Sequence, residues 1–144
     1  MPVIKAADLA YGRLRSPDLD KQEEFLTAFG MVRADRTNTA LYMRGTDAPH
    51  HIHVTELGEP KFVGIGFHAD SMEDLEKLSR VAGASPIETP DEPGGVKRVR
   101  LTDPDGYQVE VVYGMEMLPK IPVERPAVNI GEDKSRRRNS ASTA

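Results

Sequence analysis

The stretch LTDPDGYQVE, residues 101–110, decides the fold because it joins a tight turn to a strongly alternating strand. Proline presets the backbone for the first central position of a turn, and glycine accepts the left-handed conformation, so residues 103–106 (DPDG) are typical of a chain reversal. The flanking residues 96–101 and 107–113 each suit a strand. The sequence therefore predicts a closing hairpin whose last strand turns Glu110 toward the interior.

Working outward from this hairpin, the same order of elements occurs twice, which indicates an internal duplication. In the first half, residues 16–18 (SPD) begin a helix that Gly30 ends. In the second half, Ser71 begins a helix that Gly83 ends. The predicted elements are strands 9–15, 31–36, 39–44, 50–56, 61–67, 96–101 and 107–113, helices between 18 and 30 and between 71 and 83, and a short strand or loop over 86–93.

Neither half can bury a sheet face alone, so the two halves are expected to pack together. We predict an α+β fold of tandem βαβββ units, residues 9–57 and 61–113, whose curved mixed sheets surround a cleft. The domain is expected over residues 1–114. Residues 115–144 are proline-rich, then basic and of low complexity, which favours a linker-like tail.

Composition limits the setting and the partners of the protein. The 144 residues include no cysteine, which excludes disulfides and thiolate ligands and favours the cytoplasm. No run approaches the roughly 20 apolar residues of a membrane span. The net charge is −4 with both signs interspersed, and the basic run at 134–138 is interpreted as solvated. We therefore expect no membrane and no nucleic-acid partner.

Two motifs carry a resemblance to a known family. The stretch LRSPDL (14–19) and the hairpin at 101–110 resemble those of the vicinal oxygen chelate superfamily, which includes glyoxalase I, bleomycin-resistance proteins and type I extradiol dioxygenases. Segments 46–51, 61–67 and 121–138 are most similar to the N-terminal domain of an extradiol dioxygenase such as 2,3-dihydroxybiphenyl 1,2-dioxygenase. The resemblance implies that such a domain keeps the fold but has usually lost its iron.

Two classes of function follow from the resemblance. The first is extradiol ring cleavage of catechol or dihydroxybiphenyl-type substrates, with Fe(II) or another divalent metal as cofactor, or with none held by this chain. The alternative is a non-catalytic module that binds a small aromatic or anionic molecule or serves a structural role. A glyoxalase-type isomerase would need a fuller ligand set. We expect a homodimer, since two-fold pairing is the commonest assembly.

Metal ligands in the family come from the first and last strands of each unit, and the matching positions here are Tyr11, His53, Gly64 and Glu110. The resemblance therefore makes His53 and Glu110 the candidate metal ligands. Gly64 has no side chain and a neutral phenol is a poor ligand, so the two imidazoles and one carboxylate of a non-haem iron site are incomplete. The alternative for Glu110 is an ion pair with an arginine such as Arg13. No catalytic residue is assigned.

One strand face predicts a ligand pocket. Tyr11, Arg13 and Arg15 alternate on this face, and Gly64 and Gly66 leave room opposite, which favours an open, basic pocket for an anionic or phenolic molecule. Alternation alone leaves a second orientation open, in which the arginines point outward and Leu14 packs inside.

The histidine pair at residues 51–53 (HIH) gives a second ligand prediction. On a regular strand His51 and His53 share one face, about 7 Å apart. Such spacing suits a metal, and equally suits two polar side chains on a half-exposed strand. We assign His51 to ligand binding together with Tyr11, Arg13 and Gly64.

Overall fold

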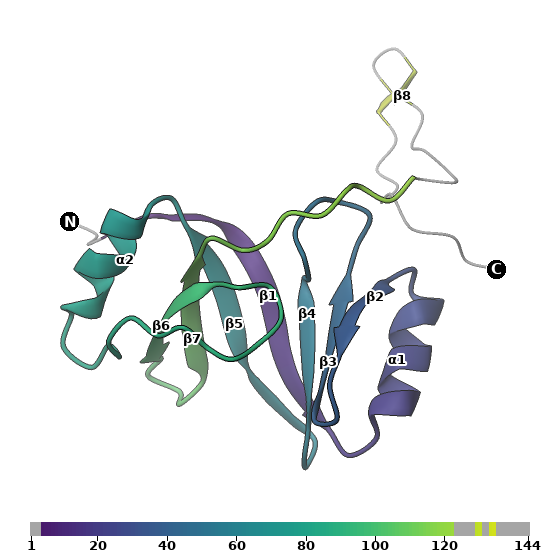
Figure 1. Cartoon of the computed structure of the whole chain (residues 1–144), viewed down its shortest axis with the longest axis horizontal. Coiled ribbons are helices and arrows are strands. Elements are labelled where there is room, and N and C mark those ends of the chain that lie inside the picture. Colours follow the sequence, from purple (N-terminus) through teal and green to yellow (C-terminus); the bar gives the residue numbers. More distant parts are fainter. Residues whose placement is uncertain (1–3, 123–128, 131–132, 135–144) are drawn as a thin grey trace.

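The computed structural model describes residues 4–122, 129–130 and 133–134. Seven strands form one mixed sheet in the order β2-β3-β4-β1-β5-β7-β6, and the two helices cover its two ends (Figure 1). No helix among these residues is long and apolar enough to cross a membrane. The elements are β1 (Ala6–Ser16), α1 (Leu19–Ala28), β2 (Val32–Arg36), β3 (Ala40–Arg44), β4 (His53–Leu57), β5 (Lys61–Ala69), α2 (Met72–Ser79), β6 (Lys97–Thr102), β7 (Gln108–Tyr113), β8 (Asn129–Ile130) and β9 (Asp133–Lys134).

The predicted tandem units and mixed sheet are confirmed. Within each unit the first strand pairs in parallel with the last, β1 with β4 and β5 with β7. The units then meet through an antiparallel pairing of β1 with β5, in which Arg13 lies opposite Gly64. The two sheets are therefore joined edge to edge into one open sheet.

Local signals in the sequence set the element boundaries. Asp18 accepts a hydrogen bond from Lys21 N (3.0 Å) at the start of α1, and Ser71 accepts one from Asp74 N (3.2 Å) at the start of α2. In the β6–β7 turn Gly106 adopts φ 89°, a backbone conformation that a side chain would strain. The predicted caps and closing hairpin are thus present.

Helix α1 packs through a narrow apolar stripe. Leu19 and Leu26 are buried against strand β3, where Leu41 lies fully enclosed. Phe25 and Phe29, which the same helical spacing brings near this stripe, are 58% and 73% exposed. The helix contacts the sheet through one side only, so these two rings lie outside the core. They pack on each other, with ring centroids 5.0 Å apart.

The sheet has two different faces. The helix face carries α1 and α2, and under α2 it buries Leu75 against Val99 and Val111. The opposite side, which we call the inner face, carries Tyr11, Tyr42 and Glu110. Since neighbouring residues on a strand point to opposite faces, Val111 and Glu110 mark the two sides of β7.

The packed chain continues past Gly114. Met115 is buried at 7% exposure in the inner-face core. The following residues run along loop 46–50 in an extended strap, held by backbone hydrogen bonds from Leu118 N to Ala48 O (2.7 Å) and from Ile121 N to Thr46 O (2.9 Å). The tail expected from residue 115 therefore includes a strap, residues 115–121, packed on the first unit. Most of residues 123–144 lie outside the described part of the chain.

Candidate functional site

Glu110 is the centre of the inner face. Its Cα pairs with Gly66 on β5, and Gly66 pairs with Tyr11 on β1, so one row of residues crosses three strands. The Glu110 side chain is fully buried and accepts hydrogen bonds from Tyr11 Oη (2.8 Å), from Arg13 Nε and Nη2 (2.7 and 3.2 Å) and from Arg98 Nη1 (3.1 Å). Three of these bonds end on Oε1 and one on Oε2, so each carboxylate oxygen has a protein donor.

The electrostatics of this carboxylate follow from its partners. Burial by itself would raise the pKa of Glu110, but the charge of Arg13 and the hydrogen bonds from Arg13 and Tyr11 outweigh burial and hold the pKa below its usual value. Glu110 is therefore ionised at neutral pH. The alternative considered for this residue, an ion pair with Arg13, is the arrangement that the structure has.

Arg13 and Arg98 surround the carboxylate with further charge. Arg13 also donates to Glu92 from Nη1 and Nη2 (3.2 and 3.1 Å). Arg98 Nε is the one fully enclosed side-chain polar atom without a hydrogen bond among the described residues, and it lies 3.7 Å from Glu88 Oε1. We call Tyr11, Arg13, Glu92, Arg98 and Glu110 the Glu110 cluster. Sequence reasoning missed Arg98, although its alternation with Arg100 beside the closing turn was a usable signal.

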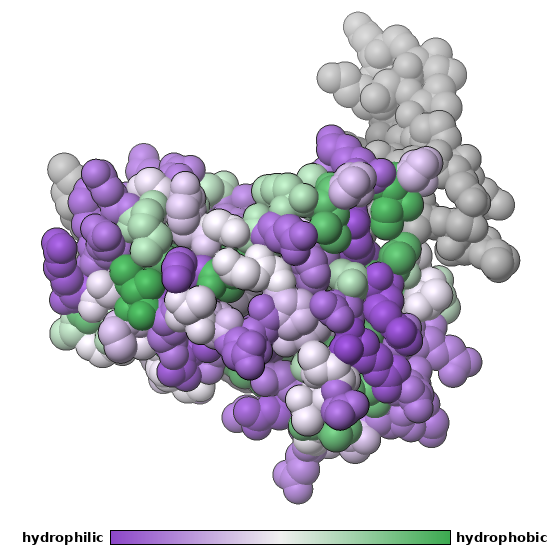
Figure 2. Space-filling view, viewed as in Figure 1, coloured by the Kyte–Doolittle hydropathy of each residue, from purple (hydrophilic) through white to green (hydrophobic). Residues whose placement is uncertain are grey.

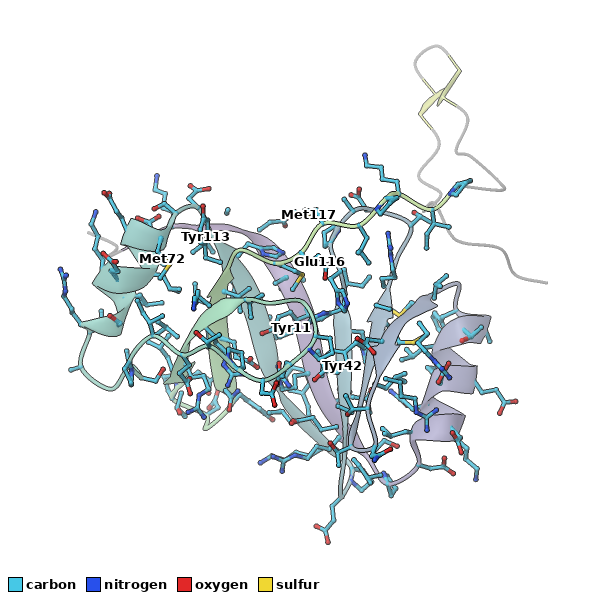
Figure 3. The ribbon with its side chains drawn as sticks, viewed as in Figure 1. Tyr11, Tyr42, Met72, Tyr113, Glu116 and Met117 are labelled. Atoms are coloured by element: carbon cyan, nitrogen blue, oxygen red, sulfur yellow. The ribbon has the colours of Figure 1, made fainter. Side chains whose placement is uncertain are left out.

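Tyr11 fills the space above a glycine. A Cβ built on Gly66 would lie 2.7 Å from Tyr11 Cζ, so the ring rests directly on the β5 backbone. Burial, followed by the charge of Glu110, raises the pKa of Tyr11, which keeps the phenol neutral and a hydrogen-bond donor. Figure 3 shows Tyr11 beside Tyr42 near the middle of the sheet.

Gly64 permits close strand pairing and leaves no room for a ligand. A Cβ at this position would lie 1.7 Å from the backbone oxygen of Gln108 on the neighbouring strand β7. No side chain fits there without moving the backbone. The expected pocket does not open over Gly64, and Arg13 is 2% exposed with its charge paired. A cavity of about 220 Å³ does lie nearby, lined by Arg13, Arg15, Arg98 and Arg100 together with Glu56 and Glu92, and Gly64 does not line it.

His51 lies next to the Glu110 cluster on the inner face. Its ring is 2% exposed and packs against the rings of Tyr11 and Tyr42, with centroids 5.3 and 5.1 Å away. Its Nδ1 lies 2.9 Å from His50 Nδ1, within hydrogen-bond distance. Burial, then the nearby His50 and Arg13, lowers the pKa of His51 to about 3, so this imidazole is neutral.

His53 lies on the other side of the sheet. It pairs with Gly12 and with Met43, a residue of the α1 core, so it belongs to the helix face. Its Nε2 lies 2.6 Å from Thr55 Oγ1, and burial lowers its pKa to about 4. The strand begins only at His53, after a bend at Ile52, so His51 and His53 do not share a face.

The candidate metal ligands are therefore not brought together. His53 and Glu110 are on opposite faces, Gly64 admits no side chain, and Glu110 is surrounded by donors. No group of three or more His, Asp or Glu side chains suited to a metal occurs in the part of the chain that the structure describes. The iron site that the resemblance implies does not fit these residues.

An acidic cavity of about 520 Å³ opens beside the Glu110 cluster. It was not predicted, since its wall combines β3 and β4 with a loop residue, Glu92, that no periodic pattern marks. The residues that define its chemistry are Arg15, Tyr42, Glu56, Glu59, Asp91 and Glu92.

Comparison with known proteins agrees with this architecture. The model of the Glyoxalase/Bleomycin resistance protein/Dioxygenase superfamily matches residues 8–111, and the chain belongs to this family. It is 28% identical over 130 residues to metapyrocatechase from Geobacillus stearothermophilus, covering 86% of this chain and 40% of that protein. The chain thus spans less than half the length of this relative.

Solved structures share the fold at lower identity. The Mn(II)-bound glyoxalase from Novosphingobium aromaticivorans has a TM-score of 0.75 and 22% identity, covering 84% of this chain and 43% of that one. A variant of homoprotocatechuate 2,3-dioxygenase from Brevibacterium fuscum has a TM-score of 0.75 and 20% identity, covering 83% and 36%. At these identities the likeness concerns the fold.

Proposed function

We propose that this chain is a non-catalytic module of the extradiol-dioxygenase type, in which an ion-pair cluster occupies the position of a metal centre. The observation that carries the proposal is the pairing of Glu110 with protein donors: its Oε1 accepts hydrogen bonds from Tyr11, Arg13 and Arg98, and its Oε2 accepts one from Arg13. A metal ligand needs a free lone pair directed at the metal. Here those lone pairs are directed at protein donors.

The chemistry of ring cleavage supports the same conclusion. A non-haem iron oxygenase requires two imidazoles and a carboxylate on one face, with open positions for substrate and oxygen. On the inner face, Glu110 accepts hydrogen bonds from protein donors, and the buried imidazole of His51 is packed between two tyrosine rings. His68 also lies on this face, opposite Val112 on β7, but the described residues hold no group of three or more His, Asp or Glu side chains suited to a metal. In metapyrocatechase-like proteins, we propose, cleavage belongs to the parts of the protein that this chain does not match.

The role left for the module is structural or ligand-binding. A buried charge cluster fixes the register of β1, β5, β6 and β7, because a slip of one residue would leave charges unpaired. The homodimer expected for the chain remains a prediction, and sedimentation at micromolar concentration tests it.

Metal analysis and a ring-cleavage assay on the same preparation test the proposal. Protein purified without chelator, then incubated anaerobically with Fe(II) and desalted, should retain far less than one iron per chain. It should form no yellow ring-fission product from catechol or 2,3-dihydroxybiphenyl, while a metapyrocatechase assayed in parallel does. A His53→Gln variant should be indistinguishable from the wild type in iron content. One iron per chain together with turnover would overturn the proposal.

A further inference from the structure

The acidic cavity has an unbalanced charge. Four carboxylates line it, from Glu56, Glu59, Asp91 and Glu92, against the single cation Arg15. Arg15 is 45% exposed at its side chain, and its Nε lies 3.9 Å from Glu56, beyond hydrogen-bond distance. Arg13 pairs with Glu92 and lies 3.8 Å from Glu56, so among the described residues the surplus negative charge comes from Glu59 and Asp91, which are exposed. This surplus favours a cation.

The carboxylates retain capacity to accept further hydrogen bonds. Within the described residues, the side chains of Glu56, Glu59 and Asp91 accept none, and each oxygen of Glu92 accepts one, from Arg13. A carboxylate oxygen has about two acceptor positions. A ligand ammonium could therefore bind at the cavity side without displacing the Glu110 cluster.

Tyr42 gives a second and independent indication of a ligand. Its side chain lines the cavity and is only 3% exposed, yet its hydroxyl makes no hydrogen bond with any described residue. The hydroxyl is not fully enclosed, since Arg98 Nε is the only enclosed polar atom without a partner in that part of the chain. The small accessible area of Tyr42 therefore opens on the cavity. Buried hydroxyls normally have a partner, and here the partner is missing on the ligand side.

The electrostatic neighbours of Tyr42 support this placement. Burial, then the charge of Glu92, raises the pKa of Tyr42 to about 12, with Glu56 acting in the same direction. Both of these carboxylates line the same cavity as Tyr42. A neutral phenol oxygen can accept a hydrogen bond from an ammonium while its proton is donated elsewhere.

We propose that this cavity binds a small organic cation, with ammonium groups on a short apolar chain held by Tyr42 Oη and the carboxylates of Glu56 and Glu92. Ala40 and Leu57 contribute apolar surface to the wall. A volume of about 520 Å³ exceeds what a single metal ion fills and lies within the usual range of small-molecule sites. The site goes beyond the proposed function, and its failure would leave the Glu110 cluster and the metal argument unchanged.

Titration with 1,6-diaminohexane at low ionic strength tests the proposal directly. Calorimetry should give saturable one-to-one binding with Kd about 1 mM or lower, a level that eight ligand heavy atoms of modest efficiency can supply. Backbone amide signals around the cavity, at Thr39, Leu57 and Gly58, should shift with the same Kd. The matched diol, 1,6-hexanediol, and the matched dianion, adipate, should not bind.

Two variants and one control locate the site. Tyr42→Phe removes only the hydroxyl and should weaken binding about tenfold, the effect of a hydrogen bond to a charged group. The exposed pair Glu59→Gln with Asp91→Asn should weaken it about fivefold. Asp105→Asn removes one exposed charge in the β6–β7 turn, which does not line the cavity. This control should leave Kd unchanged.

Several results would overturn the proposal. Equal binding of adipate or hexanediol would show that the cavity does not select positive charge. Tighter binding of Mg²⁺ with displacement of the diamine would identify an inorganic cation site instead. A folded Tyr42→Phe protein with the wild-type Kd, or amide shifts confined to other regions, would place any diamine binding elsewhere.

Discussion

Where the first unit places bulky side chains on the inner face, the second unit places glycines. Tyr11 and Arg13 on β1 lie opposite Gly66 and Gly64 on β5. The Tyr11 ring occupies the space above Gly66, and the backbone of Gln108 occupies the space beside Gly64. The glycines of the second unit are therefore not empty ligand positions. The space left by their missing side chains is occupied by the Tyr11 ring of the first unit and by the backbone of β7.

The sharpest difference between the units concerns two strand glycines. Gly64→Ala should abolish folding or cost more than about 4 kcal/mol, because its Cβ would overlap a backbone oxygen that cannot move alone. Gly12→Ala on β1 is the matched control. Its Cβ would meet nothing closer than 4.0 Å, so the free energy of unfolding should change little. Chemical denaturation of both variants decides this, and equal stabilities would show that the β5–β7 pairing is misplaced.

The next largest loss of stability is expected from removing the charge of Glu110 on β7, which pairs with Arg13 of the first unit. Glu110→Gln removes the buried counter-charge that Arg13 and Arg98 share and should destabilise by about 3–5 kcal/mol. Glu23 also accepts from two arginines, but Arg33 is half exposed, so Glu23→Gln should cost about 1 kcal/mol or less. Urea unfolding at pH 7 measures both. Similar costs would mean that the Glu110 cluster is not a buried anchor.

The same variant gives a pH dependence with a defined sign. Because the folded protein lowers the pKa of Glu110, its contribution is complete above the pKa of the unfolded chain, about 4.3, and is lost as the pH falls through the folded value. The stability gap between wild type and Glu110→Gln should therefore be constant from pH 7 to 5 and narrow below pH 4.

Removal of the strap, residues 115–121, tests whether the segment that follows the second unit stabilises the first unit. Truncation after Gly114 removes buried Met115 and the backbone hydrogen bonds to loop 46–50, and should cost about 2–4 kcal/mol. Truncation after Pro122 keeps these contacts and should unfold like the full chain. If both truncated chains unfold identically, the domain ends at Gly114 as the sequence suggested.

The smallest expected effect is the coupling between Tyr11 and Gly66. Gly66→Ala alone pushes a Cβ into the Tyr11 ring, while Tyr11→Val removes the ring and leaves space. In a double-mutant cycle, Gly66→Ala should cost about 1–3 kcal/mol less in the Tyr11→Val background. Additive costs would show that the ring does not rest on Gly66.

The sequence predicted those features of the fold that depend on neighbouring residues along the chain. The Ser71 cap, the turn at residues 103–106 and the inward direction of Glu110 all follow from local propensity and alternation. Arg13 facing inward was one of two orientations that alternation left open, and the buried partner Glu110 selects it.

The parts that failed depend on irregular backbone and long-range register. The bend at Ile52 separates His51 from His53, and no composition signal marks it. The placement of Tyr11 over Gly66 rather than beside Gly64 depends on register between strands far apart in sequence.

Under the proposed function, Glu110 is an ionised anchor of a protein cluster and not a metal ligand. Carbon-13 NMR of the labelled Glu110 carboxyl carbon tests this most directly, by titration from pH 7 to 2 and then by addition of Zn²⁺ at pH 7. We expect a pKa below that of an ordinary glutamate and a resonance that one equivalent of Zn²⁺ leaves unchanged. A pKa at or above the ordinary value, or a stoichiometric shift with Zn²⁺, would contradict it.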